Sequence, residues 1–360
     1  MSCFDDVVDC QVGIVLDVDG VLMHGSHGIA GAKEAVQRAR ERAPVLLLTN
    51  GSGSAERRAA QVRGALGLGA GAVEAGAVVL SHTPLRSEEH RAFLQSARLV
   101  VVSRSQRRSE EVAAEHGWNG GVVSVQELLR AHPQAVPILC SDAADADDSE
   151  RAIGDGRTSA GEEERLALVR EMRFEAIVLL EEPREWGSGL QLLVDVLRGS
   201  GKVGEDTAST KAISTMATAD ALGEQHLPIY ACNPDLEYRD RFPVPRLTSG
   251  AFLECLRALW RAVAASELRV EAVGKPLLST MRYAERIFEE HHRRRPALIY
   301  MIGDNPASDI RGANAAGVRW RSCLVRTGCF TGIDNDPRDP AHLVFPDVLH
   351  AIEHILSLHS

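Results

Sequence analysis

Residues 13–22 read GIVLDVDGVL, and this stretch decides how the rest of the chain is interpreted. Residues 13–16 are apolar and predict a buried strand, at whose end Asp17 and Asp19 follow two positions apart. Side chains at positions i and i+2 of a strand point to the same side, so both carboxylates can converge on one point. Because like charges repel, we expect a divalent cation between them, whose own charge would dominate the site.

Strand-like and amphipathic helical segments alternate along the chain, which predicts an α/β fold with a Rossmann-like, doubly wound parallel sheet. The expected elements near the two ends of the chain cover residues 12–18, 29–43, 45–50, 54–66, 268–276, 277–292, 297–304, 307–317 and 318–325. Parallel strands tolerate a long insertion in a connecting loop, so these two blocks can form one sheet. We therefore predict a core domain made of residues 1–82 and 269–360.

The residues between the two blocks, 83–268, have a βα alternation of their own and predict a second α/β domain inserted into the first. The strands expected there cover 98–103, 136–141, 174–183 and 227–235. Residues 142–164 are acidic, rich in small residues and lack apolar periodicity, so we expect a mobile surface loop.

The composition of the chain argues against some classes of binding partner. The chain has 360 residues, of which 44% are hydrophobic, and a net charge of −10, which argues against affinity for nucleic acid or anionic membranes. No apolar stretch approaches the roughly 20 residues that span a bilayer. Seven cysteines without a CxxC indicate reduced thiols and a cytoplasmic protein. The acidic N-terminus matches no targeting peptide, and a mitochondrial location would require an upstream extension. A homo-oligomer is compatible with these features.

A second carboxylate cluster ends another predicted strand, in MIGDNPASD at residues 301–309, where Asp304 and Asp309 lie in a tight loop. If the two strands are neighbours, four carboxylates surround one crevice, and such oxygen-only ligation suits Mg²⁺. An EF-hand is excluded, because the twelfth position counted from Asp17 is Gly28 instead of a glutamate.

Two further motifs suit a phosphate group. In LLLTNGSG, residues 46–53, Thr49 and Asn50 offer a hydroxyl and an amide, and Gly51 leaves backbone N–H groups unobstructed. Neither a P-loop nor a nucleophile elbow is present, because G-K-[ST] and G-x-S-x-G are both missing here. Lys275, in VGKP, follows a predicted strand and can neutralise the carboxylates and bind phosphate as a point charge.

The four motifs D-V-D-G, T-N, G-K-P and G-D-N-x-x-S-D, in this order, resemble the haloacid dehalogenase (HAD) superfamily of phosphohydrolases. The long insertion is similar to that of the branch with a C2-type cap. Within this branch, residues 81–87, 181–197, 233–246 and 275–285 most resemble the cat-eye-syndrome critical-region hydrolase subgroup. Two departures are Glu182, where the branch has an aspartate before the proline, and TNG in place of T-N-N.

The resemblance implies a Mg²⁺-dependent phosphatase in which Asp17 attacks the phosphorus and forms an aspartyl-phosphate. Asp19 would protonate the leaving oxygen and then deprotonate the attacking water. The implied metal ligands are Asp17, Asp304 and the backbone carbonyl of Asp19. The remaining implied positions are Thr49, Asn50, Gly51 and Lys275 for the phosphate, with Asn305 and Asp309 orienting the metal's water shell.

A cap that closes over the crevice excludes water and bulky substrates, so the expected substrate is a small phosphorylated metabolite. The candidate cap contacts to its leaving group are Glu182, Trp186, Asn233 and Asp235. Two alternatives stay open: a phosphotransferase that uses an acceptor other than water, and a binding or scaffold protein that keeps the fold with little turnover.

Overall fold

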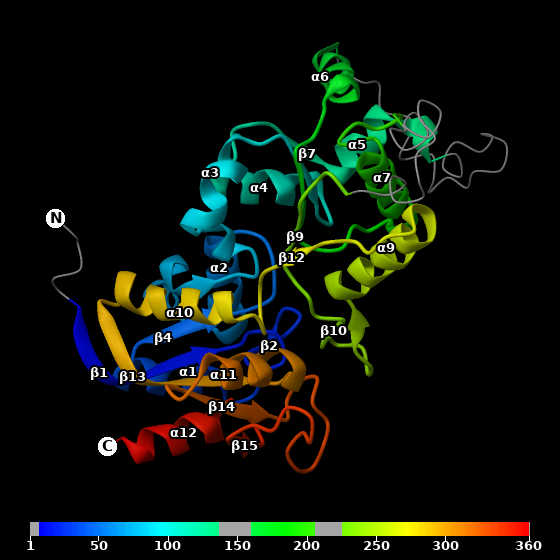
Figure 1. Cartoon of the computed structure of the whole chain (residues 1–360). Coiled ribbons are helices and arrows are strands. Elements are labelled where there is room, and N and C mark those ends of the chain that lie inside the picture. The colour runs from blue at the N-terminus through cyan, green and yellow to red at the C-terminus, as the bar shows by residue number, and fades with distance from the viewer. Residues whose placement is uncertain (1–6, 137–159, 206–224, 360) are drawn as a thin grey trace. The chain divides into compact units, whose positions relative to one another are not determined.

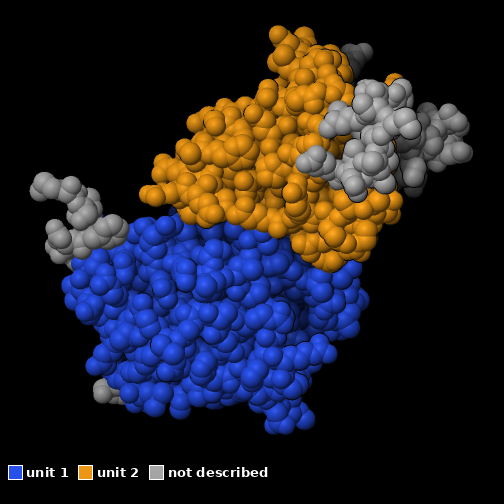
Figure 2. Space-filling model, viewed as in Figure 1, with its two compact units in different colours: residues 1–85, 232–251, 272–360 blue, residues 86–231, 252–271 orange. Residues whose placement is uncertain are grey.

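The chain forms two compact units (Figures 1 and 2). The computed structural model describes residues 7–136, 160–205 and 225–359. Unit 1 comprises residues 1–85, 232–251 and 272–360, and unit 2 comprises residues 86–231 and 252–271.

These units differ from the predicted domains in one segment. The outer boundaries, predicted after residue 82 and before residue 269, lie three residues from the observed ones. Residues 232–251, which we expected in the inserted domain, belong to unit 1 instead. Their side chains bond to unit 1, since Asp235 accepts a hydrogen bond from Asn50 and Arg241 donates one to Ser26.

Unit 1 is built on a six-stranded sheet in the order β15-β14-β13-β1-β4-β5, in which every neighbouring pair is parallel. The strands are β1 (Val8–Leu16), β4 (Val45–Leu48), β5 (Val78–Val79), β13 (Arg294–Gly303), β14 (Trp320–Val325) and β15 (Leu343–Phe345). Short antiparallel pairs join β2 (Met23–His24) to β3 (His27–Gly28) and β10 (Glu237–Tyr238) to β11 (Arg246–Leu247).

Helices cover both faces of this sheet (Figure 1). They are α1 (Ala32–Arg42), α2 (Ala55–Leu66), α10 (Leu278–Glu290), α11 (Arg311–Ala316) and α12 (Val348–Leu358). Ile14 and Leu16 of β1 pack with α1, α2 and α12, whereas Val15, which points the other way, packs with α10 and α11. The predicted doubly wound α/β fold is therefore confirmed.

Several predicted elements of unit 1 differ in the structure. The strand expected over 268–276 shortens to β12 (Glu271–Ala272), which joins the sheet of unit 2. The helix expected over 307–317 is a π-helical turn (Pro306–Ile310) followed by α11. The Asn305 side chain accepts a hydrogen bond from the backbone N–H of Ala307 and so holds the start of this turn. Strand β15 and helix α12 were not predicted from the sequence.

Unit 2 holds a five-stranded sheet in the order β12-β9-β8-β6-β7. Its other strands are β6 (Leu99–Val102), β7 (Val122–Ser124), β8 (Ala176–Leu179) and β9 (Ile229–Ala231). Its helices are α3 (Glu88–Ser96), α4 (Gln106–His116), α5 (Val125–Ala131), α6 (Ala160–Glu171), α7 (Trp186–Arg198) and α9 (Ser249–Ala264), the last of which starts in unit 1.

The predicted acidic loop at 142–164 falls mostly outside the described residues, which resume at Ala160. Its last five residues, 160–164, form the first part of α6, so this end of the loop was predicted wrongly. Most of the strand expected over 136–141 also lies outside the described residues.

Candidate active site

The carboxyl ends of the three central strands of unit 1 meet at one edge of the sheet. Leu16 pairs with Ile302 of β13 and with Leu47 of β4, so the residues that follow each strand lie next to one another. The backbone N–H of Asp17 continues the ladder by donating to the carbonyl of Ile302 at 2.9 Å. Ligands of open parallel sheets bind at this edge.

Lys275 lies between two buried carboxylates at this edge. Its Nζ is 2.6 Å from Oδ1 of Asp17 and 2.6 Å from Oδ1 of Asp309, and its side chain is 3% exposed. Asp304 completes the cluster, because one oxygen each of Asp17, Asp304 and Asp309 lie within 4.8 Å of one another. Three buried carboxylates thus lie together with one ammonium group.

Burial and mutual repulsion shift the protonation of this cluster. Burial raises the pKa of Asp17 to about 6, although the adjacent Lys275 ammonium opposes the shift. Burial, together with the charges of Asp17 and Asp309, also raises the pKa of Asp304. The two carboxylates that contact Lys275 raise the pKa of its ammonium group despite burial. The lysine consequently stays charged. Its single positive charge compensates only part of the negative charge of the three carboxylates.

Two glycines leave room around Asp304. Gly20 has φ +92°, and a Cβ at this position would lie 2.4 Å from Oδ2 of Asp304. A Cβ at Gly328 would lie 1.8 Å from the same oxygen. The backbone N–H of Cys329 approaches Oδ2 instead and donates a hydrogen bond at 2.6 Å. Side chains at these two positions would displace Asp304.

The donor set fits a hard divalent cation, because only carboxylate oxygens are gathered and their charge exceeds that of the lysine. The group contains the predicted ligands Asp17 and Asp304, whereas Asp19 was predicted to contribute its backbone carbonyl. Asp309, which we expected only to orient water, offers an oxygen to the group, and its Oδ2 accepts a hydrogen bond from the N–H of Asn305 at 3.0 Å. The Asn305 side-chain oxygen caps the following turn.

The Asp19 side chain lies outside this group and pairs with Arg58 of α2, with 2.7 Å between NH2 and Oδ2. The same guanidinium nitrogen lies 3.5 Å from Oγ1 of Thr49, which accepts a hydrogen bond from the N–H of Gly51 at 3.0 Å. Arg58 was not among the residues predicted from the sequence. The only sequence feature that could have identified Arg58 is its position in the first turns of the helix after the T-N motif. A surface arginine without a role in the site can occupy the same position.

The Asn50 side chain is held on both sides. Its Oδ1 accepts from the backbone N–H of Lys275 at 2.8 Å, and its Nδ2 donates to Oδ2 of Asp235 at 2.8 Å and to the carbonyl of Lys275 at 2.9 Å. The N–H of Asp235 in turn donates to Oδ1 of Asn233 at 2.9 Å. Asn233 and Asp235, which we predicted as cap contacts, thus belong to unit 1, and Asp235 positions Asn50.

The other two predicted cap contacts lie in unit 2. Glu182 is buried, and its Oε1 accepts a hydrogen bond from Nε of Arg104 at 2.9 Å. Trp186 packs edge-on against Phe252, with 5.5 Å between the ring centroids, and borders the core of unit 2. Both side chains thus have contacts within unit 2 that stabilise it.

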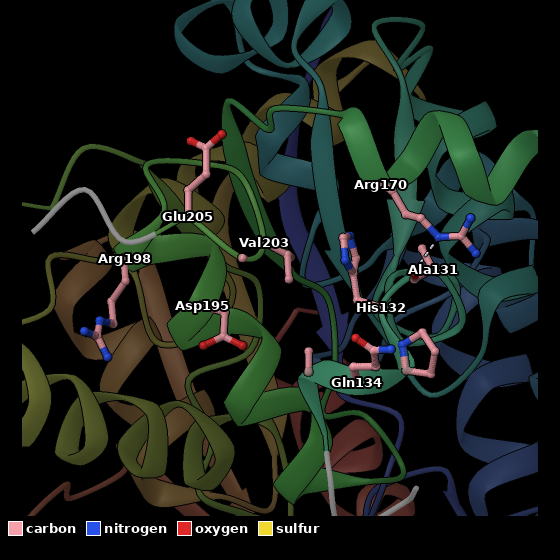
Figure 3. Close-up of a pocket in the computed structure, with 11 residues that line it drawn as sticks. Ala131, His132, Gln134, Arg170, Asp195, Arg198, Val203 and Glu205 are labelled. Atoms are coloured by element: carbon pink, nitrogen blue, oxygen red, sulfur yellow. Dashed lines mark hydrogen bonds between the residues drawn. The ribbon is translucent and has the colours of Figure 1, made fainter. Parts of the chain in front are cut away.

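Unit 2 also contains a cavity of about 690 Å³ (Figure 3). Its wall includes His132, Arg170, Asp195 and Arg198, and it contains none of the predicted site residues. Arg170 is tied to the wall by a hydrogen bond from Nε to the carbonyl of Ala131 at 2.9 Å.

Two family models match the parts of the chain that contain these carboxylates and this lysine. A haloacid dehalogenase-like hydrolase model matches residues 14–119, and a HAD-hydrolase-like model matches residues 272–351. The chain belongs to the haloacid dehalogenase-like hydrolases, as the sequence motifs predicted.

Two curated relatives match 95% of the chain. A mitochondrial hydrolase of Saccharomyces cerevisiae is 26% identical and is covered over 94% of its length. A cardiolipin synthase (CMP-forming)/mitochondrial hydrolase fusion protein of Schizosaccharomyces pombe is 29% identical, and the chain spans 52% of its length.

Solved structures share the fold. A hypothetical protein of Pyrococcus horikoshii has a TM-score of 0.59 at 18% identity, with 96% of this chain and 100% of that chain covered. A p-nitrophenyl phosphatase of Archaeoglobus fulgidus has a TM-score of 0.55 at 16% identity, with 96% and 99% covered. A glycerol phosphate phosphatase of Mycobacterium tuberculosis in complex with calcium has a TM-score of 0.53 at 19% identity, with 94% and 73% covered.

Proposed function

We propose that this protein is a Mg²⁺-dependent phosphatase that hydrolyses a small phosphorylated metabolite through an aspartyl-phosphate on Asp17. The observation that carries the proposal is the buried cluster in which Lys275 contacts Asp17 and Asp309 beside Asp304. Such a cluster is costly for stability, because three carboxylates share one counter-ion, and it is therefore expected where chemistry requires it.

In the proposed reaction, one Asp17 oxygen attacks the phosphorus and the bond from phosphorus to the leaving oxygen breaks. Lys275, bonded to Asp17, keeps this carboxylate ionised and aligned for attack. Asp19 gives a proton to the leaving oxygen, and it then takes a proton from the water that hydrolyses the acyl phosphate. Arg58 positions Asp19, and the hydroxyl of Thr49, which accepts a hydrogen bond from the N–H of Gly51, can donate to a phosphoryl oxygen.

Asp17, Asp304 and Asp309 are the side chains that would hold the metal, together with the backbone carbonyl of Asp19 that the family resemblance implies. A bound Mg²⁺ offsets the negative charge that develops on the transferring phosphoryl group.

The names of similar proteins support phosphate ester hydrolysis as the reaction and favour a location other than the predicted cytoplasm. Two structural neighbours are named as phosphatases of p-nitrophenyl phosphate and glycerol phosphate. Both curated relatives carry the word mitochondrial, which favours the mitochondrial alternative over the predicted cytoplasmic location. None of the helices in the described part of the chain combines the length and apolar character that crossing a membrane requires. We propose that unit 2 acts as the cap that selects the substrate.

The test is hydrolysis of p-nitrophenyl phosphate and a panel of phosphorylated metabolites by the purified chain, with Mg²⁺ and with EDTA. We expect Mg²⁺-dependent phosphate release that Asp17→Asn abolishes, and trapping of ³²P on the wild-type protein alone. Equal turnover by Asp17→Asn would refute the nucleophile. Phosphate that appears on an added alcohol instead of in solution would identify a phosphotransferase. Absence of turnover across the panel would favour a binding protein.

A further inference from the structure

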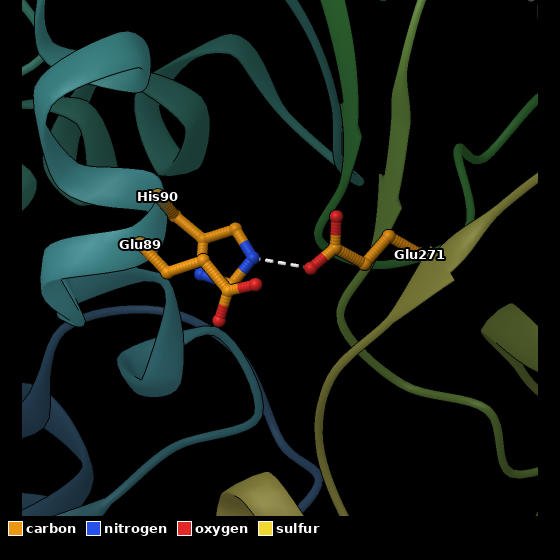
Figure 4. A group of neighbouring side chains, drawn as sticks. All are labelled: Glu89, His90 and Glu271. Atoms are coloured by element: carbon orange, nitrogen blue, oxygen red, sulfur yellow. Dashed lines mark hydrogen bonds and ion pairs between the residues drawn. The ribbon is translucent and has the colours of Figure 1, made fainter.

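A second group of ligand-type side chains lies in unit 2, at the start of α3 (Figure 4). Glu89 and His90 extend from α3, and Glu271 extends toward them from β12. One atom of each residue lies within 4.8 Å of the other two, and Nε2 of His90 contacts Oε1 of Glu271 directly. None of the three residues belongs to the phosphatase cluster described above.

His90 is held in place by neighbours on its other sides. Its Nδ1 lies 2.9 Å from Oγ of Ser87, and the residue is 7% exposed. The Tyr230 ring meets it edge-on, with 5.6 Å between the centroids. Ser87 is the N-cap residue of α3, but its side chain caps no backbone N–H, since its hydroxyl bonds the histidine instead. The ring orientation is therefore fixed with Nε2 facing the carboxylates.

Either a hydrogen atom or a metal ion can lie between Nε2 of His90 and the carboxylate of Glu271. The Ser87 hydroxyl can donate to Nδ1 or accept from it, so both tautomers of the ring are satisfied. When Nδ1–H donates to Ser87, the Nε2 lone pair faces a carboxylate oxygen, and only a cation between them makes this arrangement stable. An imidazole whose other nitrogen is hydrogen-bonded is the usual form of a histidine metal ligand.

We propose that Glu89, His90 and Glu271 bind a Zn²⁺ ion. One imidazole and two carboxylates are donors that zinc accepts, and a water molecule can fill the fourth tetrahedral position. Bonds of about 2.1 Å bring tetrahedral ligands about 3.4 Å apart. The carboxylates must therefore close in slightly, which Glu89 can do because its side chain is exposed and Glu271 because its side chain is 49% exposed.

The three ligands lie close to the points where the chain enters and leaves unit 2. Glu89 and His90 follow the first passage into the unit, after residue 85, and Glu271 is the last residue before the final passage out. Tyr230, against the histidine ring, immediately precedes the passage after residue 231. A bound ion would thus join the two ends of unit 2 to each other and stabilise this unit.

The test is Zn²⁺ titration of the whole protein by calorimetry, in excess Mg²⁺ so that the phosphatase cluster is occupied. We expect one more bound Zn²⁺ in the wild type than in His90→Ala, and a rise in Tm with Zn²⁺ that this variant lacks. Glu89→Gln alters an exposed side chain only, and it should weaken the same site at least about tenfold. Glu88→Gln, an exposed neighbour on the same helix, is the matched control and should bind like the wild type.

Equal Zn²⁺ affinity in the wild type and Glu89→Gln, or equal stoichiometry in the wild type and His90→Ala, would overturn the proposal. Neither outcome affects the proposed phosphatase, because its activity is measured without Zn²⁺.

Discussion

Replacing Lys275 by methionine removes the only cation in contact with Asp17 and Asp309 among the described residues. Methionine keeps the length of the buried stem, so the change isolates the charge. Removing one partner of a buried ion pair costs about 3–5 kcal/mol, because the remaining charge is left uncompensated. Here two carboxylates lose their partner, at 2.6 Å each, with Asp304 beside them. We expect Lys275→Met to destabilise metal-free unit 1 by about 3–5 kcal/mol at pH above 8.

The destabilisation caused by Lys275→Met should become smaller as the pH is lowered. The pKa of Asp17 is already raised to about 6 in the wild type, and loss of the ammonium raises it further. A carboxyl group whose folded pKa exceeds its unfolded value takes up a proton on folding, which stabilises the folded state as the pH decreases through the folded pKa. The difference from the wild type therefore shrinks by up to about 1.4 kcal/mol per pH unit for one proton, and it levels off below about pH 6.

Urea unfolding followed by ¹⁹F NMR of 5-fluorotryptophan-labelled protein measures this effect, because Trp320 lies in the sheet of unit 1 and reports on that unit. Lys33→Met changes an exposed lysine of α1 and should stay within about 0.5 kcal/mol of the wild type. Mg²⁺ should restore part of the stability of Lys275→Met. A cost below about 1 kcal/mol, or one that is equal at pH 8 and pH 6, would show that Lys275 does not neutralise the cluster.

Three further substitutions test other parts of unit 1. Gly20→Ala should lower stability by about 1–2 kcal/mol and reduce Mg²⁺-dependent turnover, because φ is +92° and the new Cβ would displace Asp304. The control is Gly69→Ala, where no atom lies within 4 Å of the added Cβ. Asp347→Ala removes the N-cap of α12 and should lower stability by about 1 kcal/mol at pH 7 without changing kcat. This cost should vanish in acid, since the hydrogen bond to His350 lowers the pKa of Asp347, and its contribution is lost as pH falls through that value. Arg58→Met should lower kcat about 10- to 100-fold with little change in Tm, because Asp19 loses the partner that positions it.

Sequence patterns alone predicted much of the core of the site. Parallel strands bring their carboxyl ends to one edge, so D-V-D-G after one strand and G-D-N after another were expected to meet once the strands proved adjacent. The residue type of Lys275 and the predicted strand before it led to the prediction that this lysine neutralises the carboxylates. That strand, β12, is only two residues long and joins the sheet of unit 2.

The rest depended on local geometry that residue patterns do not encode. Asp309 joins the cluster because residues 306–310 form a π-helical turn, and an ordinary α-helical turn would place its carboxylate differently. Arg58 reaches Asp19 from a helix whose orientation follows from tertiary packing. Residues 232–251 were assigned to the inserted domain by chain order, yet the Asp235 carboxylate binds Asn50, and this long-range contact leaves no periodic signal.

The charges of the cluster connect its cost in stability with the chemistry proposed for it. Asp17, Asp304 and Asp309 bring three negative charges and Lys275 brings one positive charge, so the ionised cluster carries −2 in a buried site. A phosphate monoester dianion would be repelled by that charge. Burial, together with the neighbouring carboxylate charges, also raises the pKa values of Asp17 and Asp304. One divalent cation offsets this negative charge, which keeps Asp17 ionised for attack and makes approach of the phosphate favourable. Metal binding and nucleophile ionisation should therefore be coupled, so that Mg²⁺ titrations at pH 6 release more protons than those at pH 8, and Asp17→Asn should reduce this difference to the share that Asp304 contributes.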